Sequence, residues 1–241
     1  MIKIEYKVGD THLNSNNTLM KIVEYNSPMN VVIEFQDEHK FRKKTYIQNF
    51  KKGDVRNPYD KTVYDIAYLG DGDYKVWVDN HKTDTYGVWH DMVERCYNEK
   101  TRHAHMAYKD CTVCNEWLNY QTFCKWYYEN YYSTGEGRMH LDKDILVKNN
   151  RIYSPETCIF VPQRINMMFI HQPNKLGLPT GMTKSSKGYR TLYNGKLLGI
   201  YINLDKALEA YMKEKRLHIK QVADEYKNKI PNKLYKALYA W

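Results

Sequence analysis

Histidine and aspartate alternate in one short stretch of the chain, at His140, Asp142 and Asp144. Alternate positions of an extended strand point to one face, so a strand here presents the imidazole and both carboxylates side by side. Imidazoles and carboxylates are common general acids and bases, and carboxylate oxygens also hold hard divalent cations. This stretch is therefore the first candidate for a catalytic site.

Four of the five cysteines form a second candidate group, and the middle two make a Cys-x-x-Cys pair. They are Cys96, Cys111, Cys114 and Cys158. Four thiolates can hold a structural Zn²⁺ ion, but cysteines also pack as small hydrophobic side chains, so both interpretations stay open. The odd count and the charged, alternating N-terminus favour thiols or metal ligands over a disulfide framework.

The residues around the His-Asp stretch predict the elements that must position it. A strand is expected over 138–147, a turn over 148–150 and extended chain over 151–153. A short strand over 158–161 and a helix over 163–169, opened by a proline, follow. The predicted order is strand, turn, short loop and helix.

The first part of the chain predicts β structure. Strands are expected over 19–25 and 31–35, and a second strand pair over 63–69 and 74–78, joined by the Gly-Asp-Gly-Asp turn at 70–73. The two pairs indicate a small β unit followed by a hairpin that leads into the next module.

Apolar residues at helical spacing predict helices over 85–98 and 116–131. The second helix is rich in aromatic residues, among them Trp117 and Trp126. Aromatic stripes at this spacing usually fill a core, so we expect packing rather than base stacking from these two rings.

The last segment predicts a linker over 171–180, three strands and a long helix. The strands are expected over 181–184, 189–193 and 197–202, and Asn203 or Asp205 caps the helix. Lys215 falls on the apolar face of this helix and is expected to extend its ammonium to solvent. A final short helix is expected over 232–241.

The formal charge of +9 is unevenly placed. Residues 171–241 hold 14 Lys and Arg against five acidic residues, whereas residues 1–170 hold equal numbers of both signs. A basic segment of this kind favours a polyanionic partner, although a solvated basic helix would give the same composition.

Several motifs in the middle of the chain resemble phage HNH-like (His-Me finger) proteins of the homing-endonuclease type. They are Trp89-x-x-Met92-x-x-Arg95-Cys96-Tyr97, Tyr108 to Trp117, Leu141-Asp142-Lys143-Asp144, and Tyr153-Ser154-Pro155-Glu156-Thr157-Cys158-Ile159-Phe160-Val161 with Gln163 and Asn166 behind. The resemblance implies a ββα unit that hydrolyses phosphodiester bonds with one divalent ion, Mg²⁺ or Mn²⁺.

The resemblance also assigns roles to residues. Asp142 matches the acidic metal ligand and Asn166 the distal Asn or His of the helix, so both are expected to hold the divalent ion. Lys143 stands where the family normally has its catalytic His, and could hold the scissile phosphate as a point charge or be solvated. His140 is then the nearest substitute for the base, and Asp144 lies beside it.

The C-terminal segment looks like the APETALA2-type DNA-binding domain that such phage proteins often carry. The matching residues are Leu178 to Met182, Tyr189-Arg190, Asn194-Gly195-Lys196-x-Leu198-Gly199 and Asp205 to Tyr211. The resemblance implies a sheet in the major groove of double-stranded DNA. Lys184, Lys187, Arg190 and Lys196 would then contact phosphates and base edges.

Together these features predict a modular α+β chain in a bacterial host cytoplasm, with no membrane span. We expect a β-rich N-terminal unit (1–57), an HNH-like domain with a leading hairpin (58–170) and an APETALA2-like domain (171–241). The predicted function is a metal-dependent DNA endonuclease of phage homing type, nicking one strand or cutting both. The alternative is a non-catalytic DNA-binding, regulatory or counter-defence phage protein with a degenerate HNH unit.

Overall fold

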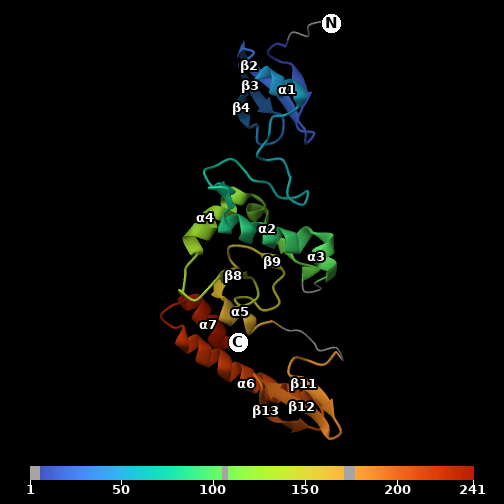
Figure 1. The fold of residues 1–241 in the computed structure, drawn as a ribbon, viewed down its shortest axis with the longest axis vertical. Coiled ribbons are helices and arrows are strands. Elements are labelled where there is room, and N and C mark those ends of the chain that lie inside the picture. Colours follow the sequence, from blue (N-terminus) through green and yellow to red (C-terminus); the bar gives the residue numbers. More distant parts are fainter. Residues whose placement is uncertain (1–5, 105–107, 171–176) are drawn as a thin grey trace. The chain divides into compact units, whose positions relative to one another are not determined.

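The computed structural model describes residues 6–104, 108–170 and 177–241 and divides into two compact units, Met1–Tyr127 and Tyr128–Trp241. Both units contain helices and small sheets, which confirms the predicted α+β class (Figure 1). Most of the predicted linker at 171–180 lies outside the described residues. Within the described part of the chain, none of the helices has the length and apolar character needed to cross a membrane.

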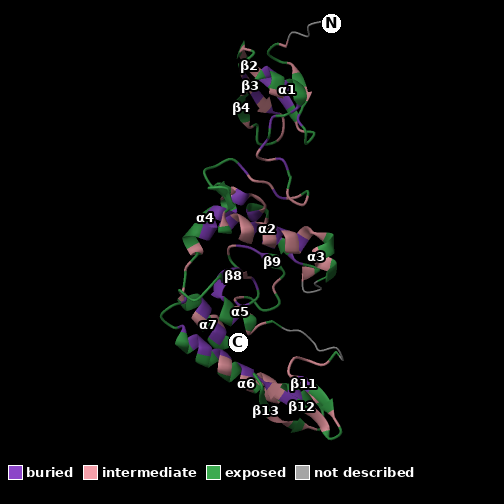
Figure 2. Cartoon of the chain, viewed as in Figure 1, coloured by how far each residue is buried: buried purple, intermediate pink, exposed green. Residues whose placement is uncertain are grey.

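The first unit begins with an antiparallel sheet in the order β1-β2-β3-β4. The strands are β1 (Thr11–Leu13), β2 (Leu19–Ser27), β3 (Asn30–Phe35) and β4 (Arg42–Thr45), followed by helix α1 (Ile47–Lys52). Strand β3 alternates, so that Val31, Ile33 and Phe35 are buried against Phe50 of α1 (Figure 2). The two predicted strands at 19–25 and 31–35 are confirmed.

The predicted hairpin of 63–69 with 74–78 is wrong. The hairpin forms further on, between β5 (Trp77–Val78) and β6 (His81–Lys82). Its turn residues, Asp79 and Asn80, both have positive φ, as a type I′ turn requires. Residues 68–74 bond instead to the segment around 118–121, because the Tyr68 N–H donates to Leu118 O and the Tyr74 N–H donates to the Gln121 side chain.

Helices and short elements follow β6. They are α2 (Asp84–Tyr97), α3 (Glu99–Ala104), β7 (Thr112–Val113), the 3-10 helix η2 (Asn115–Leu118) and α4 (Tyr120–Asn130). The last of them, α4, runs three residues past the end of the first unit at Tyr127. The single helix predicted over 116–131 is interrupted at Asn119, which has extended backbone angles and whose Oδ1 accepts the Gln121 N–H at 2.9 Å. Trp117 and Trp126 are buried with ring centroids 4.6 Å apart, which confirms their packing role.

The second unit contains two strands and a helix in the predicted order. Strand β8 (Met139–Asp142) pairs antiparallel with β10 (Ile159–Pro162), with β9 (Ile152–Tyr153) between them in sequence. Helix α5 (Gln163–Met167) follows Pro162 directly and contacts both β8 and β10. This is a ββα hairpin, and β8 is shorter than the predicted strand 138–147.

The C-terminal sheet runs in the order β11-β12-β13 and was predicted closely. Its strands are β11 (Met182–Ser185), β12 (Gly188–Tyr193) and β13 (Lys196–Tyr201). Helix α6 (Leu204–Glu225) packs on β12 and β13, and its first turn is capped because the Asn203 side chain accepts the Lys206 N–H. Helix α7 (Asn232–Ala240) ends the chain.

Helix α6 takes part in two packing layers. Its N-terminal half buries Ala207 toward the sheet, whereas Ile219, Val222 and Ala223 share a core with α7 and the ββα hairpin. The hairpin contributes Ile145, Ile159, Val161 and Ile165 to that core. The ββα unit and the C-terminal segment therefore share one hydrophobic core, and the predicted boundary at 170/171 falls inside this packing unit.

Candidate functional site

His140 and Asp142 lie on the face of the β8–β10 pair that α5 covers. The strand register places His140 opposite Val161 and Asp142 opposite Ile159. Residues directly opposite in an antiparallel pair project to the same face. Val161 and Ile159 pack with Ile165 of α5 in the shared core. His140 and Asp142, both half buried, therefore project from β8 to the side on which α5, the helix that carries Asn166, packs.

Asp142 ends its strand by capping the turn that follows. Its Oδ1 accepts the backbone N–H groups of Asp144 and Ile145, each at 2.7 Å. The expectation that Asp142 and Asp144 share one strand face is therefore wrong, because the chain leaves the strand at Asp142. Asp144 lies in the bend, and its carboxylate is about half exposed.

Burial raises the pKa of the Asp142 carboxyl above its usual value, and the nearby Asp144 charge acts in the same direction. The two backbone N–H donors and the Lys143 ammonium act in the opposite direction but do not outweigh burial. A cation beside the second oxygen would offset the loss of hydration. Among the described residues, the donors to this carboxylate bond its Oδ1, so Oδ2 remains an available acceptor.

Lys143 is a buried residue of the turn, with 5% of its surface exposed. Its ammonium donates to Asp144 Oδ2 at 2.7 Å and to the Asn150 carbonyl at 3.0 Å. The Asn150 amide returns hydrogen bonds to the Lys143 and Ile152 carbonyls. These contacts engage two of the three N–H donors of the Lys143 ammonium with groups of the loop, which gives this side chain a structural place there.

Asp142 and the Asn166 amide on α5 offer oxygen donors of the type that Mg²⁺ or Mn²⁺ prefers. One carboxylate and one amide leave most ligand positions to water and phosphate oxygens, and Mg²⁺ characteristically keeps several waters. Asn166 is half buried on a helix whose neighbouring residue Ile165 is fully buried, which fixes the helix against the strands.

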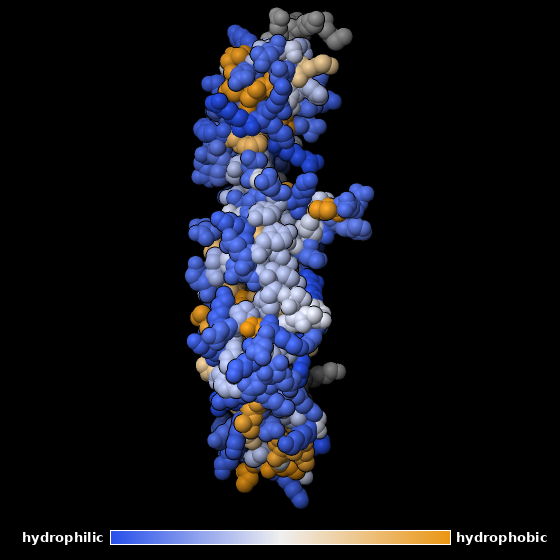
Figure 3. Space-filling model, turned by 90° about the vertical axis from the view of Figure 1, so that its left-hand side faces the viewer, coloured by the Kyte–Doolittle hydropathy of each residue, from blue (hydrophilic) through white to orange (hydrophobic). Residues whose placement is uncertain are grey.

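The C-terminal sheet has one face on α6 and one free face, and Arg190 lies on the free face. Arg190 pairs across the sheet with Thr183 and Ile200, and all three side chains are exposed. The next residue, Thr191, faces the helix and is fully buried. Exposed Leu197 and Ile200 add apolar surface to the free face, and Figure 3 shows hydrophobic atoms among hydrophilic ones over this sheet.

The predicted DNA-binding lysines of the sheet do not share this face. Lys196 lies opposite the buried Tyr193 and pairs with Glu214 of α6 at 3.2 Å, so it points toward the helix side. Lys184 lies opposite Tyr189 on the same side, at the exposed end of β11. Lys187 is exposed in the two-residue turn between β11 and β12. The sequence grouped four basic residues that the fold distributes over two faces and a turn.

The predicted zinc ligands are mostly buried. Cys96, Cys111 and Cys158 are buried and Cys114 is half buried. Among the described residues, the His, Cys, Asp and Glu side chains whose ligand atoms gather within 4.8 Å in a group of three or more are His90, Asp91 and Glu94, and none of these is a cysteine. The zinc site stays a prediction.

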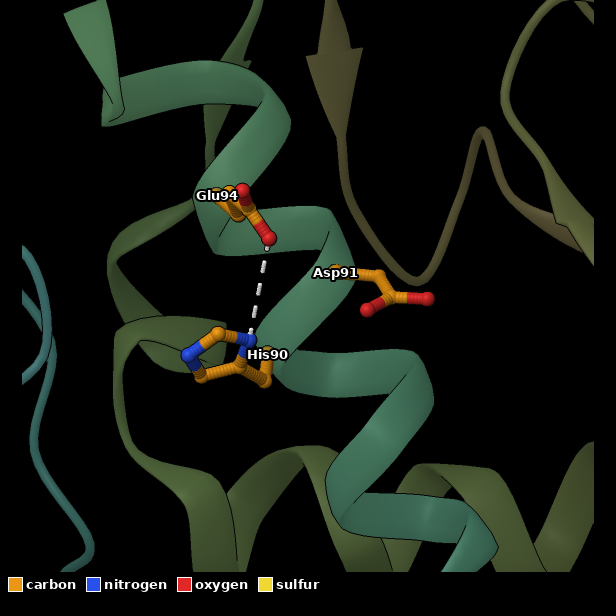
Figure 4. Close-up of side chains that lie close together, drawn as sticks. All are labelled: His90, Asp91 and Glu94. Atoms are coloured by element: carbon orange, nitrogen blue, oxygen red, sulfur yellow. Dashed lines mark ion pairs between the residues drawn. The ribbon is translucent and has the colours of Figure 1, made fainter. Parts of the chain in front are cut away.

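The His90 group comes from a single helix, α2 (Figure 4). His90 Nδ1 and Glu94 Oε2 face one another at 4.0 Å, one helical turn apart, and one ligand atom from each of the three residues lies within 4.8 Å of the other two. Glu94 also accepts a hydrogen bond from the Thr101 hydroxyl. We regard this group as a helical ion pair, because the observed contacts are those of an i, i+4 pair.

No family model matches the chain, and no curated protein or solved structure is significantly similar to it.

Two features of the site were missed from the sequence. The hydrogen bonds between Lys143 and Asn150 join residues seven positions apart, and no spacing rule marks such a pair. The His90–Glu94 pair has the i, i+4 spacing of neighbours on a helix, so the helix predicted over 85–98 would have revealed it.

Proposed function

We propose that this protein is a metal-dependent DNA endonuclease whose ββα hairpin holds a divalent cation at Asp142 and Asn166. One observation carries the proposal: β8 directs His140 and Asp142, two residues apart, to the face on which Ile165 of α5, the helix that carries Asn166, packs. A bound divalent cation would supply positive charge for the phosphate oxygens and the leaving oxygen during hydrolysis.

The chain's own groups then have separate tasks. Asp142 Oδ1 holds the turn, and Oδ2 is the oxygen left to face the cation. The His140 imidazole is the group that would take a proton from the attacking water, since it shares the face of Asp142. On the C-terminal sheet, Arg190 would bind DNA from the free face, with apolar support from Ile200.

Asp142→Asn is a sharp test because an amide oxygen can still accept the N–H groups of the turn, whereas the charge is lost. With supercoiled plasmid and Mg²⁺ or Mn²⁺, we expect the variant to nick at least about a hundredfold more slowly than wild type. Glu156→Gln, an exposed charge change in the loop before β10, is the matched control and should nick normally. Nicking that persists in EDTA, or an unimpaired Asp142→Asn protein, would contradict the proposal.

One observation favours a second candidate function, a non-catalytic DNA-binding protein. The side chain at the usual position of the base is a lysine, and its ammonium is engaged with Asp144 and Asn150. In this case the hairpin would serve as a scaffold for the sheet. Duplex binding without cleavage in any divalent metal would select this function over the nuclease.

A further inference from the structure

A pocket of about 740 Å³ lies in the first unit, beside the β1–β4 sheet. One side is formed by the turn at 15–18 and the loop at 37–39, and the other by residues of the segment 59–68. The residues that line this pocket all belong to the first unit, and the proposed nuclease does not use them.

Three aromatic rings line one part of this pocket. His39 stacks on Tyr59 with ring centroids 3.9 Å apart and an interplanar angle of 12°. Tyr68 is inclined at 54° to both, with its centroid 5.8 Å from Tyr59 and 5.9 Å from His39. Inclined rings form a corner whose π faces attract cations. Of the Lys and Arg residues that the structure describes, none is stacked over Tyr59 or Tyr68.

The lining of the pocket is acidic. Asp37, Glu38, Asp60 and Asp65 contribute carboxylates, and Lys61 contributes an ammonium. Uncharged side chains donate hydrogen bonds to the more buried carboxylates. Asp60 accepts hydrogen bonds from the side chains of Asn14, Asn16 and Thr18, and Asp37 accepts one from the Asn57 side chain. Neutral donors carry no charge that would cancel the formal charge of these carboxylates. The pocket therefore combines negative charge with exposed ring surface.

The walls are fixed before any ligand binds. The Tyr68 backbone donates to Leu118 O and accepts from the Tyr120 N–H, each at 3.0 Å. Asp60 is 7% exposed and ties its segment to the turn at 14–18. A preformed site loses little conformational entropy on binding, which favours a specific ligand over diffuse attraction.

We propose that this pocket, bounded by His39, Tyr59 and Tyr68 and by the carboxylates of Asp37, Glu38 and Asp65, binds an alkylammonium or guanidinium group. The aromatic corner selects against strongly hydrated inorganic cations, and the carboxylates select against neutral ligands. The same chemistry is offered by lysine or arginine side chains of a peptide and by free polyamines.

Isothermal titration of the full chain would test the site with three probes: spermidine, a short arginine–lysine peptide and Mg²⁺ at equal ionic strength. Asp65→Asn removes one exposed charge at a position with positive φ that asparagine tolerates, and Asp54→Asn is a matched exposed control outside the pocket. Tyr68→Leu removes a ring and keeps an apolar side chain, with its folding checked by circular dichroism.

We expect saturable binding of an organic cation, weakened about threefold by Asp65→Asn and about tenfold by Tyr68→Leu, and unchanged by Asp54→Asn. Binding of the peptide but not of spermidine would identify a protein source, and the reverse a free polyamine; either supports the site. No saturable binding of either probe, equal competition by Mg²⁺, or equal effects of Asp65→Asn and Asp54→Asn would overturn the proposal. If Tyr68→Leu does not fold, the comparison of Asp65→Asn with Asp54→Asn tests the proposal.

Discussion

Lys215 carries an amine into a core of aromatic rings. We expected its ammonium to extend to solvent, but the residue is only 2% exposed. Its ammonium lies 4.7 Å from the Trp241 ring centroid and 5.7 Å from that of Phe169. Burial lowers the pKa of Lys215 to about 8, because the charged form loses its hydration. The expectation was wrong because helical spacing predicts the face from which a side chain projects, but not that the rings of Phe169 and Trp241 lie over that face.

This burial predicts a pH-dependent stability. The unfolded chain keeps a proton on this amine up to about pH 10.5, and the folded chain only up to about pH 8. The unfolded state therefore binds more protons between these values, and the free energy of unfolding should rise through that window by up to about 3 kcal/mol. Urea denaturation of wild type against Lys215→Met should show this rise in the wild type alone.

Lys213→Met is the matched control, since Lys213 lies on the same helix and is exposed. It should follow the wild-type pH profile. A stability difference between wild type and Lys215→Met that does not change from pH 8 to 10.5 would show that the amine is hydrated in the folded state.

The candidate site was predictable only in part at the residue scale. The two-residue spacing of His140 and Asp142 predicted correctly that they lie on the same face of a strand, because both belong to β8. Asp144 was misplaced because Asp142 uses its own carboxylate to end the strand, a local competition that β-strand patterning does not register. Lys143 was left open between phosphate binding and solvation, and the structure instead buries it against Asn150.

At the scale of elements, turn chemistry decided which predictions held. Asn194 and Gly195 both have positive φ in the predicted turn between β12 and β13, and the strands on either side were placed to within a residue or two. The Gly-Asp-Gly-Asp turn at 70–73 is equally suggestive, but residues 68 and 74 form their hydrogen bonds with residues 118–121. A distant partner of this kind is invisible in a local pattern.

The two faces of the C-terminal sheet give a direct test of DNA binding. Arg190 is on the free face, whereas Lys196 is turned toward Glu214 of α6. If the free face contacts a base edge, Arg190→Ala should raise the duplex Kd by about five- to a hundredfold. Lys196→Ala removes the same charge from the opposite side and should change Kd less than about threefold. Fluorescence anisotropy would measure both; equal losses would mean that charge alone, and not the sheet face, sets the affinity.

At the scale of the whole molecule, the boundary suggested by the distribution of charge differs from the boundary suggested by hydrophobic packing. The excess of nine positive charges lies in residues 171–241. The core around Ile219 and Leu234, however, includes Ile159 and Val161 of the ββα hairpin. Composition therefore predicted a separate C-terminal module, whereas packing joins it to the hairpin, because α6 is long enough to serve both. If the hairpin cuts DNA and the sheet binds it, as proposed, their joining through α6 would hold the two in a fixed geometry.

The charge distribution makes a last prediction for the full chain. Each phosphate neutralised by a lysine or arginine releases condensed counterions, so contact with about four to six phosphates should make log affinity fall with log salt at a slope of about −4 to −5. Anisotropy titrations of one duplex across a series of KCl concentrations would give this slope. Arg190→Ala should reduce its magnitude by less than about one if Arg190 reads a base, and by about one if it binds a phosphate. Residues 171–241 hold 14 basic residues, and a nucleic acid that bound them would release counterions. An affinity that does not change with salt would therefore exclude DNA as the principal ligand.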